Sequence, residues 1–253
     1  MALVERGLAA SREKAQALIM AGRVRVDGTP ASKPGTAIRG DVLVVVLPGP
    51  EHVGRGAIKL AGGLDGLALD PAGRIAVDIG ASTGGFTETL LARGALRVYA
   101  VDVGRAQLHE KLRADPRVLV LEGVNARTLR ELPEACGFAT VDVSFISVLK
   151  ILPALRNLLA PDAALAVLVK PQFEVGRGQV GRGGIVRDAA LHRRALEDIA
   201  HGAQALGYGL RGACVSPIEG AEGNREFFLA LTRDGAPLAP GAFDAMIGRA
   251  LQP

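Results

Sequence analysis

The sequence predicts an α/β protein in which helices cover an open, mostly parallel sheet, with a small α+β unit before it. Three observations support this prediction. Seven short aliphatic runs recur between residues 74 and 232, with helical stretches between most of them. The composition is 49% hydrophobic but only 4% aromatic, which suits helices packed on a parallel sheet. Residues 1–47 follow a different pattern, with one helical stretch and short alternating runs.

The first segment is expected to form a helix, a hairpin and a further strand. Ser11 is a suitable helix N-cap, and Gly22 is a typical helix stop. Residues 23–26 alternate Arg with Val, and the Asp-Gly pair that follows is a hairpin turn signal. A second alternating run closes this unit near residue 47. Residues 48–56 are rich in Pro and Gly and are predicted to be a linker.

The second segment, residues 57–253, alternates predicted strands with predicted helices. In an open sheet of this kind, a ligand binds beyond the carboxyl ends of the strands. Helices are expected from Thr83, Gln107, Val148 and Asp188 onward. The predicted strands are residues 74–80, 97–104, 117–123, 139–146, 164–171, 208–217 and 226–232.

The positive charge is concentrated in the first quarter of the chain. Residues 1–60 carry nine Lys/Arg against five Asp/Glu, whereas residues 61–253 carry 21 of each. A local surplus of this kind is the electrostatic footprint of a phosphate-backbone partner, although a merely solvated surface would look the same. The candidate RNA-binding residues of this segment are Arg6, Arg12, Lys14, Arg23, Arg25 and Lys33.

Several classes of protein are disfavoured by what the sequence lacks. There is no uncharged apolar run of about 18 residues and no apolar signal-peptide core, so we expect a cytoplasmic protein without membrane contact. Cys136 and Cys214 show no metal-ligand spacing, and the four histidines are scattered. We therefore expect no metal and reduced thiols. No pattern specifies an oligomeric state.

A glycine-containing turn, "AVDIGASTGGFTETLL" at residues 76–91, is the first candidate for ligand binding. Its glycines, Gly80, Gly84 and Gly85, let the backbone turn sharply and approach a ligand closely. Their spacing differs from the G-x-G-x-x-G of dinucleotide-binding folds. Asp78 ends the strand inside the turn, which suits a cationic or zwitterionic ligand better than a diphosphate.

A second carboxylate completes a nucleoside site. Asp102 ends the next predicted strand, 24 residues after Asp78, where a carboxylate can accept both hydroxyls of a ribose. A nucleoside without a diphosphate fits both acids, which favours S-adenosylmethionine over NAD and disfavours an oxidoreductase. The candidate cofactor-binding residues are Asp78, Gly80, Ala81, Ser82, Thr83, Gly84, Gly85, Phe86, Asp102, Val103, Asn125 and Asp142.

Charged residues at other strand ends indicate the chemistry of the acceptor. Asp142 and Lys170 end two predicted strands, Glu226 begins the last one, and Lys59 precedes the first. The topology could bring all four to one rim. A ribose 2′-hydroxyl is a poor acid, and an amine can accept its proton or orient its oxygen while carboxylates tune the amine. Asp142 is followed by Val-Ser-Phe rather than Pro-Pro-aromatic, which disfavours methylation of an adenine amino group. Isolated surface ion pairs are the alternative for each residue alone.

The stretch after Lys170, "FEVGRGQVGRGGIVRD", is rich in glycine and arginine. Arg177 and Arg182, with Arg187, are candidates to bind RNA phosphates above the site, although an ordinary surface loop has the same composition. Phe173 is a candidate for stacking on a flipped nucleotide, and core packing is its alternative role.

Two resemblances to known families cover nearly the whole chain. "SREKAQALIMAGRVRVDG" resembles the S4 RNA-binding domain over residues 1–47. "GAIKLAGGL", "DIGASTGGFTETLLARGA", "VDVSFIS", "VKPQFEVGRGQVGRGGIVRD" and "GNREFF" resemble the TlyA (hemolysin A) family. Members of that family join an S4 domain to an FtsJ-type methyltransferase domain with a Rossmann-like, seven-stranded, mostly parallel sheet.

The resemblance implies a function and a catalytic set. It implies S-adenosylmethionine-dependent 2′-O-methylation of a cytidine in ribosomal RNA, with a catalytic tetrad of Lys59, Asp142, Lys170 and Glu226. The predicted substrate is 23S RNA, with 16S RNA as an additional candidate. The N-terminus is abbreviated relative to the S4 family, either because the first helix is short here or because the true start lies upstream, and this favours the narrower range. An S4 protein with a non-catalytic Rossmann-like domain is the main alternative. A membrane-active haemolysin is disfavoured, because no segment has the length or amphipathic character to act on a membrane.

Overall fold

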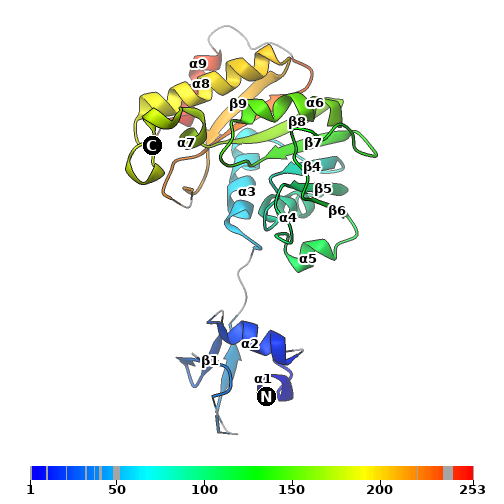
Figure 1. The fold of residues 1–253 in the computed structure, drawn as a ribbon, viewed down its shortest axis with the longest axis vertical. Helices are drawn as coiled ribbons and strands as arrows, with labels where there is room; N and C mark the ends of the chain where they lie inside the picture. Colours follow the sequence, from blue (N-terminus) through cyan, green and yellow to red (C-terminus); the bar gives the residue numbers. More distant parts are fainter. Residues whose placement is uncertain are drawn as a thin grey trace. The chain divides into compact units, whose positions relative to one another are not determined.

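The computed structural model describes residues 2–9, 11–20, 22–31, 33–36, 38–39, 42–47, 52–220, 222–235 and 242–252. The side chains of Ala17 and Arg177 also lie outside the described part. The chain divides into two compact units, Met1–Glu51 and His52–Pro253, which are drawn in Figure 1.

The described residues of the N-terminal unit form two helices and a small antiparallel sheet. Its elements are α1 (Ala2–Glu5), α2 (Arg12–Met20), β1 (Val24–Val26), β2 (Thr29–Pro30) and β3 (Val44–Val46), with strand order β2-β1-β3. The Ser11 hydroxyl accepts a hydrogen bond from the Lys14 amide at 3.2 Å, as expected of an N-cap. Asp27 and Gly28 both have positive φ, 47° and 79°, which the tight hairpin turn requires.

The C-terminal unit is built on a seven-stranded sheet. Five neighbouring strands run parallel, and β10 is antiparallel to both of its neighbours, so the predicted mostly parallel sheet is confirmed. In spatial order the strands are β6 (Val118–Glu122), β5 (Arg97–Asp102), β4 (Ile75–Ile79), β7 (Cys136–Val141), β8 (Leu159–Val169), β10 (Phe227–Thr232) and β9 (Gly209–Val215).

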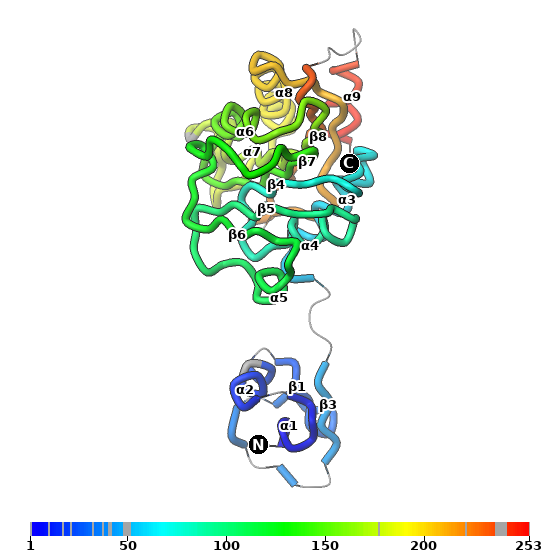
Figure 2. The backbone as a smooth tube through the Cα atoms, turned by 90° about the vertical axis from the view of Figure 1, so that its right-hand side faces the viewer, coloured from blue at the N-terminus to red at the C-terminus, as the bar shows by residue number. Residues whose placement is uncertain are grey.

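Helices cover both faces of this sheet (Figure 2). One layer consists of α3 (Arg55–Leu67), α4 (Gly85–Ala92) and α5 (Glu110–Arg113). The other consists of α6 (Leu152–Leu158), α8 (Ala189–Ala205) and α9 (Ala242–Ala250). Short helical turns connect them: α7 (Pro171–Glu174), η1 (Val148–Lys150), η2 (Arg177–Gln179) and η3 (Arg182–Gly184).

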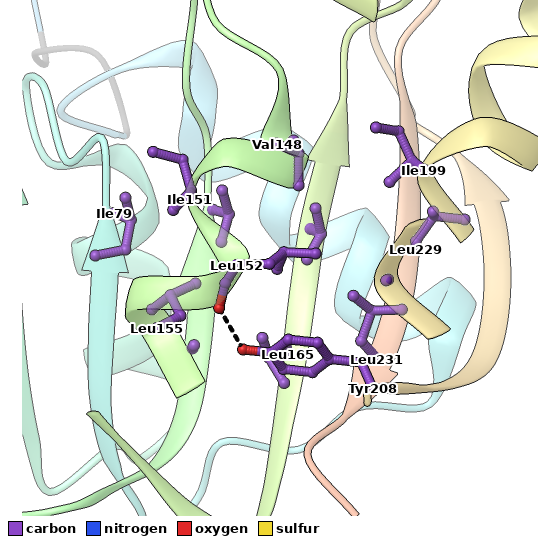
Figure 3. Close-up of a cluster of buried hydrophobic side chains, with 14 of the residues drawn as sticks. Ile79, Val148, Ile151, Leu152, Leu155, Leu165, Ile199, Tyr208, Leu229 and Leu231 are labelled. Atoms are coloured by element: carbon purple, nitrogen blue, oxygen red, sulfur yellow. Dashed lines mark hydrogen bonds between the residues drawn. The ribbon is translucent and has the colours of Figure 1, made fainter. Parts of the chain in front are cut away.

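Alternation along each strand assigns side chains to one layer or the other. Val77 and Ile79 of β4 pack toward α6 and α8, whereas Ala76 packs toward α3 and α4. Figure 3 shows the hydrophobic cluster between the sheet and helices α6 and α8. In it, the Tyr208 hydroxyl donates a hydrogen bond to the Leu152 carbonyl at 2.8 Å. Both faces are therefore buried, which explains the nearly continuous aliphatic runs in the sequence.

Helix α3 lies unusually close to the sheet. A Cβ at Gly63 would come within 2.7 Å of the Phe228 ring, so the helix can approach β10 only because this residue is glycine. The helix begins at Arg55, inside the stretch predicted to be linker, and the Val53 amide donates to Glu88 of α4 at 3.0 Å. Residues 48–51 of that stretch lie outside the described part.

Candidate active site

The turn after β4 is pressed against the turn after β7. The amides of Gly80 and Ala81 both donate to the Val101 carbonyl, at 2.8 and 3.1 Å. Gly80 has φ of 84°, and a Cβ there would lie 2.2 Å from the Asp142 carbonyl oxygen. Glycine is required at position 80 for both reasons. The candidate cofactor loop and the candidate catalytic Asp142 are consequently in direct backbone contact.

Asp78 is placed differently from the sequence prediction. Its side chain is fully buried, and its two carboxylate oxygens accept hydrogen bonds from Thr87 of α4 at 2.7 Å and Thr140 of β7 at 2.8 Å. Burial raises the pKa of this carboxyl to about 6, against the opposing effect of the two threonine hydroxyls. Asp78 therefore lies beneath the turn, which it joins to α4 and β7, and it does not line the cavity described below.

Asp102 lies at the rim of a cavity and organises two neighbouring turns. Its Oδ2 accepts from the Ser82 amide at 2.8 Å, and its Oδ1 accepts from the Gly104 amide at 2.7 Å. Ser82 has a positive φ of 49°, an uncommon conformation for a residue with a side chain. The carboxylate of Asp102 thus holds the ends of β4 and β5 together beside the cavity.

The cavity has a volume of about 470 Å³ and opens at the carboxyl ends of the parallel strands. This is the size and position expected of a small-molecule site in an open α/β sheet. Six of the predicted cofactor residues line it: Gly80, Ser82, Asp102, Val103, Asn125 and Asp142. Their common location fits a nucleoside-sized ligand.

The other predicted cofactor residues do not line this cavity. Thr83 is exposed beside it, while Ala81, Gly84, Gly85 and Phe86 are buried. Phe86 packs on Phe228, with ring centroids 6.0 Å apart, and so belongs to the core. A Cβ at Gly84 would meet Leu112 of α5 at 2.2 Å. The N-terminus of α4 is therefore packed against α5, unlike the exposed helix N-terminus that receives a diphosphate.

The four predicted catalytic residues form two ion pairs. Lys59 Nζ of α3 lies 2.6 Å from Glu226 Oε2, and the two side chains are only 10% and 3% exposed. Lys170 Nζ lies 2.5 Å from Asp142 Oδ1 and donates a hydrogen bond to the Ser144 hydroxyl at 3.0 Å. Ion pairs removed from water cost desolvation energy, so their place at strand ends points to a role beyond stability.

The sheet register brings these two pairs together. Phe227 of β10 is paired with Val169 of β8, so the next step along both strands sets Glu226 opposite Lys170. On the other side, Val141 of β7 is paired with Val167. Asp142 therefore follows a neighbouring strand at the same edge. Of these four residues, only Asp142 lines the cavity, and it connects the cavity to Lys170.

An aromatic pair stands beside this group. Phe145, three residues after Asp142, is 90% exposed and has a positive φ of 64°. Its ring centroid is 5.0 Å from that of Phe173 in α7. Phe145 lines the cavity, whereas Phe173 is only half-buried. A fully solvated aromatic side chain in a strained conformation is unfavourable on its own, so it indicates a binding surface.

The loop after α7 is named here the cationic loop and comprises residues 175–187. It contains three arginines and no acidic residue. Arg182 and Arg187 are exposed, while the Arg177 side chain lies outside the described part. At the start of the loop, Glu174 accepts a hydrogen bond from the Val148 amide at 3.0 Å. Burial raises the pKa of Glu174.

The predicted RNA-binding residues of the N-terminal unit differ in what they contact. Three of them donate to backbone carbonyls: Arg6 to Val42, Arg23 to Leu47 and Arg25 to Gly28. Arg12 and Lys33 are exposed and line one cavity of this unit. Lys14, beside Arg12, is also exposed on α2. Exposed cations therefore lie on helix α2 and on the loop after the hairpin, and Arg6 after α1 is exposed as well.

The described residues contain neither a metal-binding cluster nor a membrane-spanning helix. Within the described ranges, no group of three or more His, Cys, Asp or Glu could hold a metal ion. No helix of the described residues has the length and hydrophobicity to cross a bilayer. Cys136 and Cys214 are both free thiols, and burial raises the pKa of each.

Comparison with known proteins assigns both units. The S4 domain family matches residues 1–44, and the FtsJ-like methyltransferase family matches residues 52–233. A Mycobacterium tuberculosis protein named 16S/23S rRNA (cytidine-2′-O)-methyltransferase TlyA is 50% identical over 96% of this chain and 93% of its own. This chain belongs to the TlyA family.

Further TlyA relatives extend the comparison. The Campylobacter jejuni 23S rRNA (cytidine-2′-O)-methyltransferase TlyA is 36% identical, and the match covers 70% of this chain and 69% of that protein. A Streptococcus thermophilus structure solved under the name hemolysin is 39% identical with a TM-score of 0.75, over 98% of this chain and 93% of that one. The resemblance to the TlyA family is confirmed, as is the α/β fold class, and the chain is an enzyme of the methyltransferase class.

Sequence reasoning missed several residues at this site. Ser144 and Phe145 follow Asp142 directly, and an aromatic residue beside a strand-end acid is a signal that could have identified Phe145. Thr87 and Thr140, which hold Asp78, belong to different elements, and no local pattern connects them to it. Their role depends on tertiary contacts that no spacing rule describes.

Proposed function

We propose that this enzyme transfers a methyl group from S-adenosylmethionine to the 2′-hydroxyl of a cytidine in ribosomal RNA. The observation that carries the proposal is the position of Asp142, which lines the cofactor-sized cavity and pairs with Lys170. The names of the M. tuberculosis and C. jejuni relatives support the same reaction. We take 23S RNA as the first substrate and 16S RNA as the second.

The residues at the cavity fit S-adenosylmethionine better than a dinucleotide. Asp102 stands where it can accept ribose hydroxyls, and Asn125 and Val103 line the same cavity for the base. The buried N-terminus of α4 offers no diphosphate site. When bound, S-adenosylmethionine supplies an electrophilic methyl carbon on a sulfonium, so the carbon–sulfur bond breaks as the oxygen–carbon bond forms.

The Lys170–Asp142 pair is proposed to activate the 2′-oxygen. As the oxygen attacks, its hydroxyl proton must leave. Lys170, once its ammonium group has released a proton to solvent, would orient the oxygen as a neutral amine and accept that proton. Asp142 and Ser144 fix the lysine amine at 2.5 and 3.0 Å. The negative charge of Asp142 would stabilise the positive charge that develops on the lysine.

The Lys59–Glu226 pair is proposed to complete the tetrad. Glu226 is set beside Lys170 by the β8–β10 register, and Lys59 neutralises Glu226 from α3 at 2.6 Å. With the pair in place, the site holds two lysines beside two carboxylates. Correct alignment of the reacting atoms is expected to supply a large part of the rate enhancement.

The RNA is proposed to be held by both units. We assign residues 1–47 as the S4-like RNA-binding domain, 48–56 as the linker and 57–253 as the methyltransferase domain. Arg12, Lys14 and Lys33 present exposed cations in the first, and Arg182 does so in the cationic loop. The exposed ring of Phe145, backed by Phe173, is proposed to stack on the flipped base.

The test measures transfer of labelled methyl groups to purified ribosomal subunits and to free rRNA. We expect label in the large subunit, at a cytidine 2′-oxygen, and loss of that label in Lys170→Ala. Binding of rRNA without any methyl transfer would instead support the alternative of a non-catalytic S4 protein. Full activity in Lys170→Ala would refute the assigned catalytic role and leave the reaction itself standing.

A further inference from the structure

The cationic loop makes few contacts along its middle. An added Cβ at Gly176, Gly178, Gly183 or Gly184 would meet nothing within 4 Å. Gly176, Gly183 and Gly184 also have positive φ, which few other residues adopt readily. Within the loop, the Gly181 amide donates to the Ile185 carbonyl at 3.1 Å, but these four glycines add no side-chain packing against the rest of the unit. The position of the loop therefore depends strongly on how its two ends are held.

The second end of the loop is held by the side chain of Asn224. Asn224 Oδ1 accepts from the Val186 amide at 2.9 Å, and Nδ2 donates to the Gly184 carbonyl at 2.9 Å. Asn224 is 1% exposed and Val186 is buried, so the bond between them is made away from water, while the bond to the exposed Gly184 is partly buried. An amide is required here, because the loop presents one donor and one acceptor that must be matched together.

Val186 is also held from a second side. Its carbonyl accepts from His192 Nε2 of α8 at 2.8 Å, and the His192 ring packs on Phe227 with centroids 5.4 Å apart. Both Val186 and His192 are buried. The last residues of the loop are thereby fixed to α8 and to the first residue of β10.

Asn224, with its hydrogen bonds to Gly184 and Val186, anchors the end of the cationic loop, and it lies close in sequence to a candidate catalytic residue. It precedes Glu226 by only two residues, and Glu226 pairs with Lys59. The other end of the loop begins beside Lys170, where Glu174 binds the Val148 amide. One end of the cationic loop therefore adjoins Lys170, and the other adjoins Glu226.

We propose that Asn224 is a positioning residue for RNA binding, which holds the cationic loop so that Arg182 and Arg187 face the RNA backbone. The inference rests on the proposed function, in which this loop binds rRNA phosphates. In this proposal Asn224 affects the affinity for RNA although it contacts neither the RNA nor the cofactor. Loss of its side chain would leave the Val186 amide and the Gly184 carbonyl without their buried partners, which releases the loop.

The first experiment compares binding of Asn224→Ala to free 23S RNA and to S-adenosylmethionine. We expect affinity for RNA to fall about tenfold and affinity for S-adenosylmethionine to change less than about twofold. Thr232→Ala is the matched control, because it removes hydrogen bonds at the opposite end of β10, to Asp234 and Gly209. That variant should bind RNA as the parent does. Equal losses for both ligands would contradict a positioning role.

A double-mutant cycle tests whether Asn224 acts through the loop. Arg182→Ala should weaken RNA binding in the parent but have a smaller effect once Asn224 is replaced, because the loop is already displaced. Arg117→Ala removes the same charge at the start of β6 and should weaken binding little in either background. Fully additive effects of Asn224→Ala and Arg182→Ala would overturn the proposal.

A third measurement needs neither RNA nor methyl transfer. Hydrogen exchange of the Val186 amide should become faster in Asn224→Ala, and trypsin should cleave faster after Arg182 and Arg187. If the enzyme proves not to methylate rRNA, the proposed function fails, yet this measurement still reports on the anchor. Unchanged exchange at Val186 would refute the anchor even in a fully active enzyme.

Discussion

Lys59 and Glu226 are separated by 167 residues in the chain, yet Lys59 Nζ lies 2.6 Å from Glu226 Oε2 in a nearly water-free contact. The two charges depend on each other, because removal of either one leaves the other buried and uncompensated. The contribution of this pair to stability can be separated experimentally from its contribution to catalysis. A neutral pair of similar shape can restore the stability but not the proposed catalytic role.

Glu226→Ala is expected to lower the free energy of unfolding by about 3–5 kcal/mol, because Lys59 is then left buried without a partner. The double variant Lys59→Met/Glu226→Gln should regain most of that stability, since no unpaired charge remains. Denaturant unfolding measures the change in stability. Single-turnover methyl transfer measures the change in catalytic rate. A double variant that regains both stability and activity would show that the pair is purely structural.

Lys170→Ala is expected to reduce the rate of methyl transfer by about 10²–10⁴-fold, the usual contribution of a general base. Its binding of S-adenosylmethionine should stay close to that of the parent, because Lys170 does not line the cavity. Isothermal titration gives the cofactor affinity, and a labelled-methyl assay gives the rate. Lys150→Ala, an exposed lysine on η1, is the matched control.

Phe145→Ala is expected to weaken RNA binding or turnover by about 5–150-fold, the equivalent of one lost base stack of roughly 1–3 kcal/mol. The 90% exposed ring contributes little to the fold, so thermal unfolding should be almost unchanged. Phe145→Tyr and Phe145→Trp retain a stacking surface and should retain most of the activity. A loss of activity in Phe145→Trp as large as in Phe145→Ala would argue against stacking.

Asp78 is expected to make stability fall as the pH rises through 6. In the folded chain its pKa is raised from 3.8 to about 6, so between those values the folded state binds more protons than the unfolded state. Between pH 5 and pH 7 this costs about 1 kcal/mol of unfolding free energy. Asp78→Asn should lack this component, and the difference between parent and variant should shrink toward pH 5. If the difference in unfolding free energy between parent and variant did not change with pH, the raised pKa of Asp78 would be contradicted.

Removal of residues 1–50 is expected to weaken rRNA binding while leaving the affinity for S-adenosylmethionine nearly intact. The cavity for the cofactor is lined entirely by residues 79–151, in the C-terminal unit. The loss should be greatest at low salt, because exposed cations such as Arg12 and Lys33 act through the phosphate charge. Filter binding at several salt concentrations measures this. Equal loss of both ligands would contradict separate roles for the two units.

The sequence predicted the seven strands because each is a short aliphatic run, and the central ones are buried on both faces. Such runs can be recognised without tertiary information. It also placed Asp102 and Asp142 at strand ends, where the cavity has them. Asp78 could not be placed in the same way. Whether a strand-end carboxylate faces the ligand or the interior depends on its neighbours, and Thr87 and Thr140 lie 9 and 62 residues away.

The prediction was least complete where function depends on loops. The arginines after Lys170 were visible as a charge pattern, but the anchor that holds them is an asparagine about 40 residues later. The place of Phe86 in the turn predicts a cofactor residue, yet its ring packs on Phe228 in the core. A residue's position in a motif does not specify the direction of its side chain.

The order of strands in the sheet has a consequence for how the enzyme is made. β10 is synthesised after β8 and β9, yet it lies between them and carries Glu226 at its first end. A nascent chain on the ribosome therefore cannot form the Lys59–Glu226 contact until its last strand has emerged and inserted. Synthesis must therefore pass β10 before the pair that the proposed reaction requires can form.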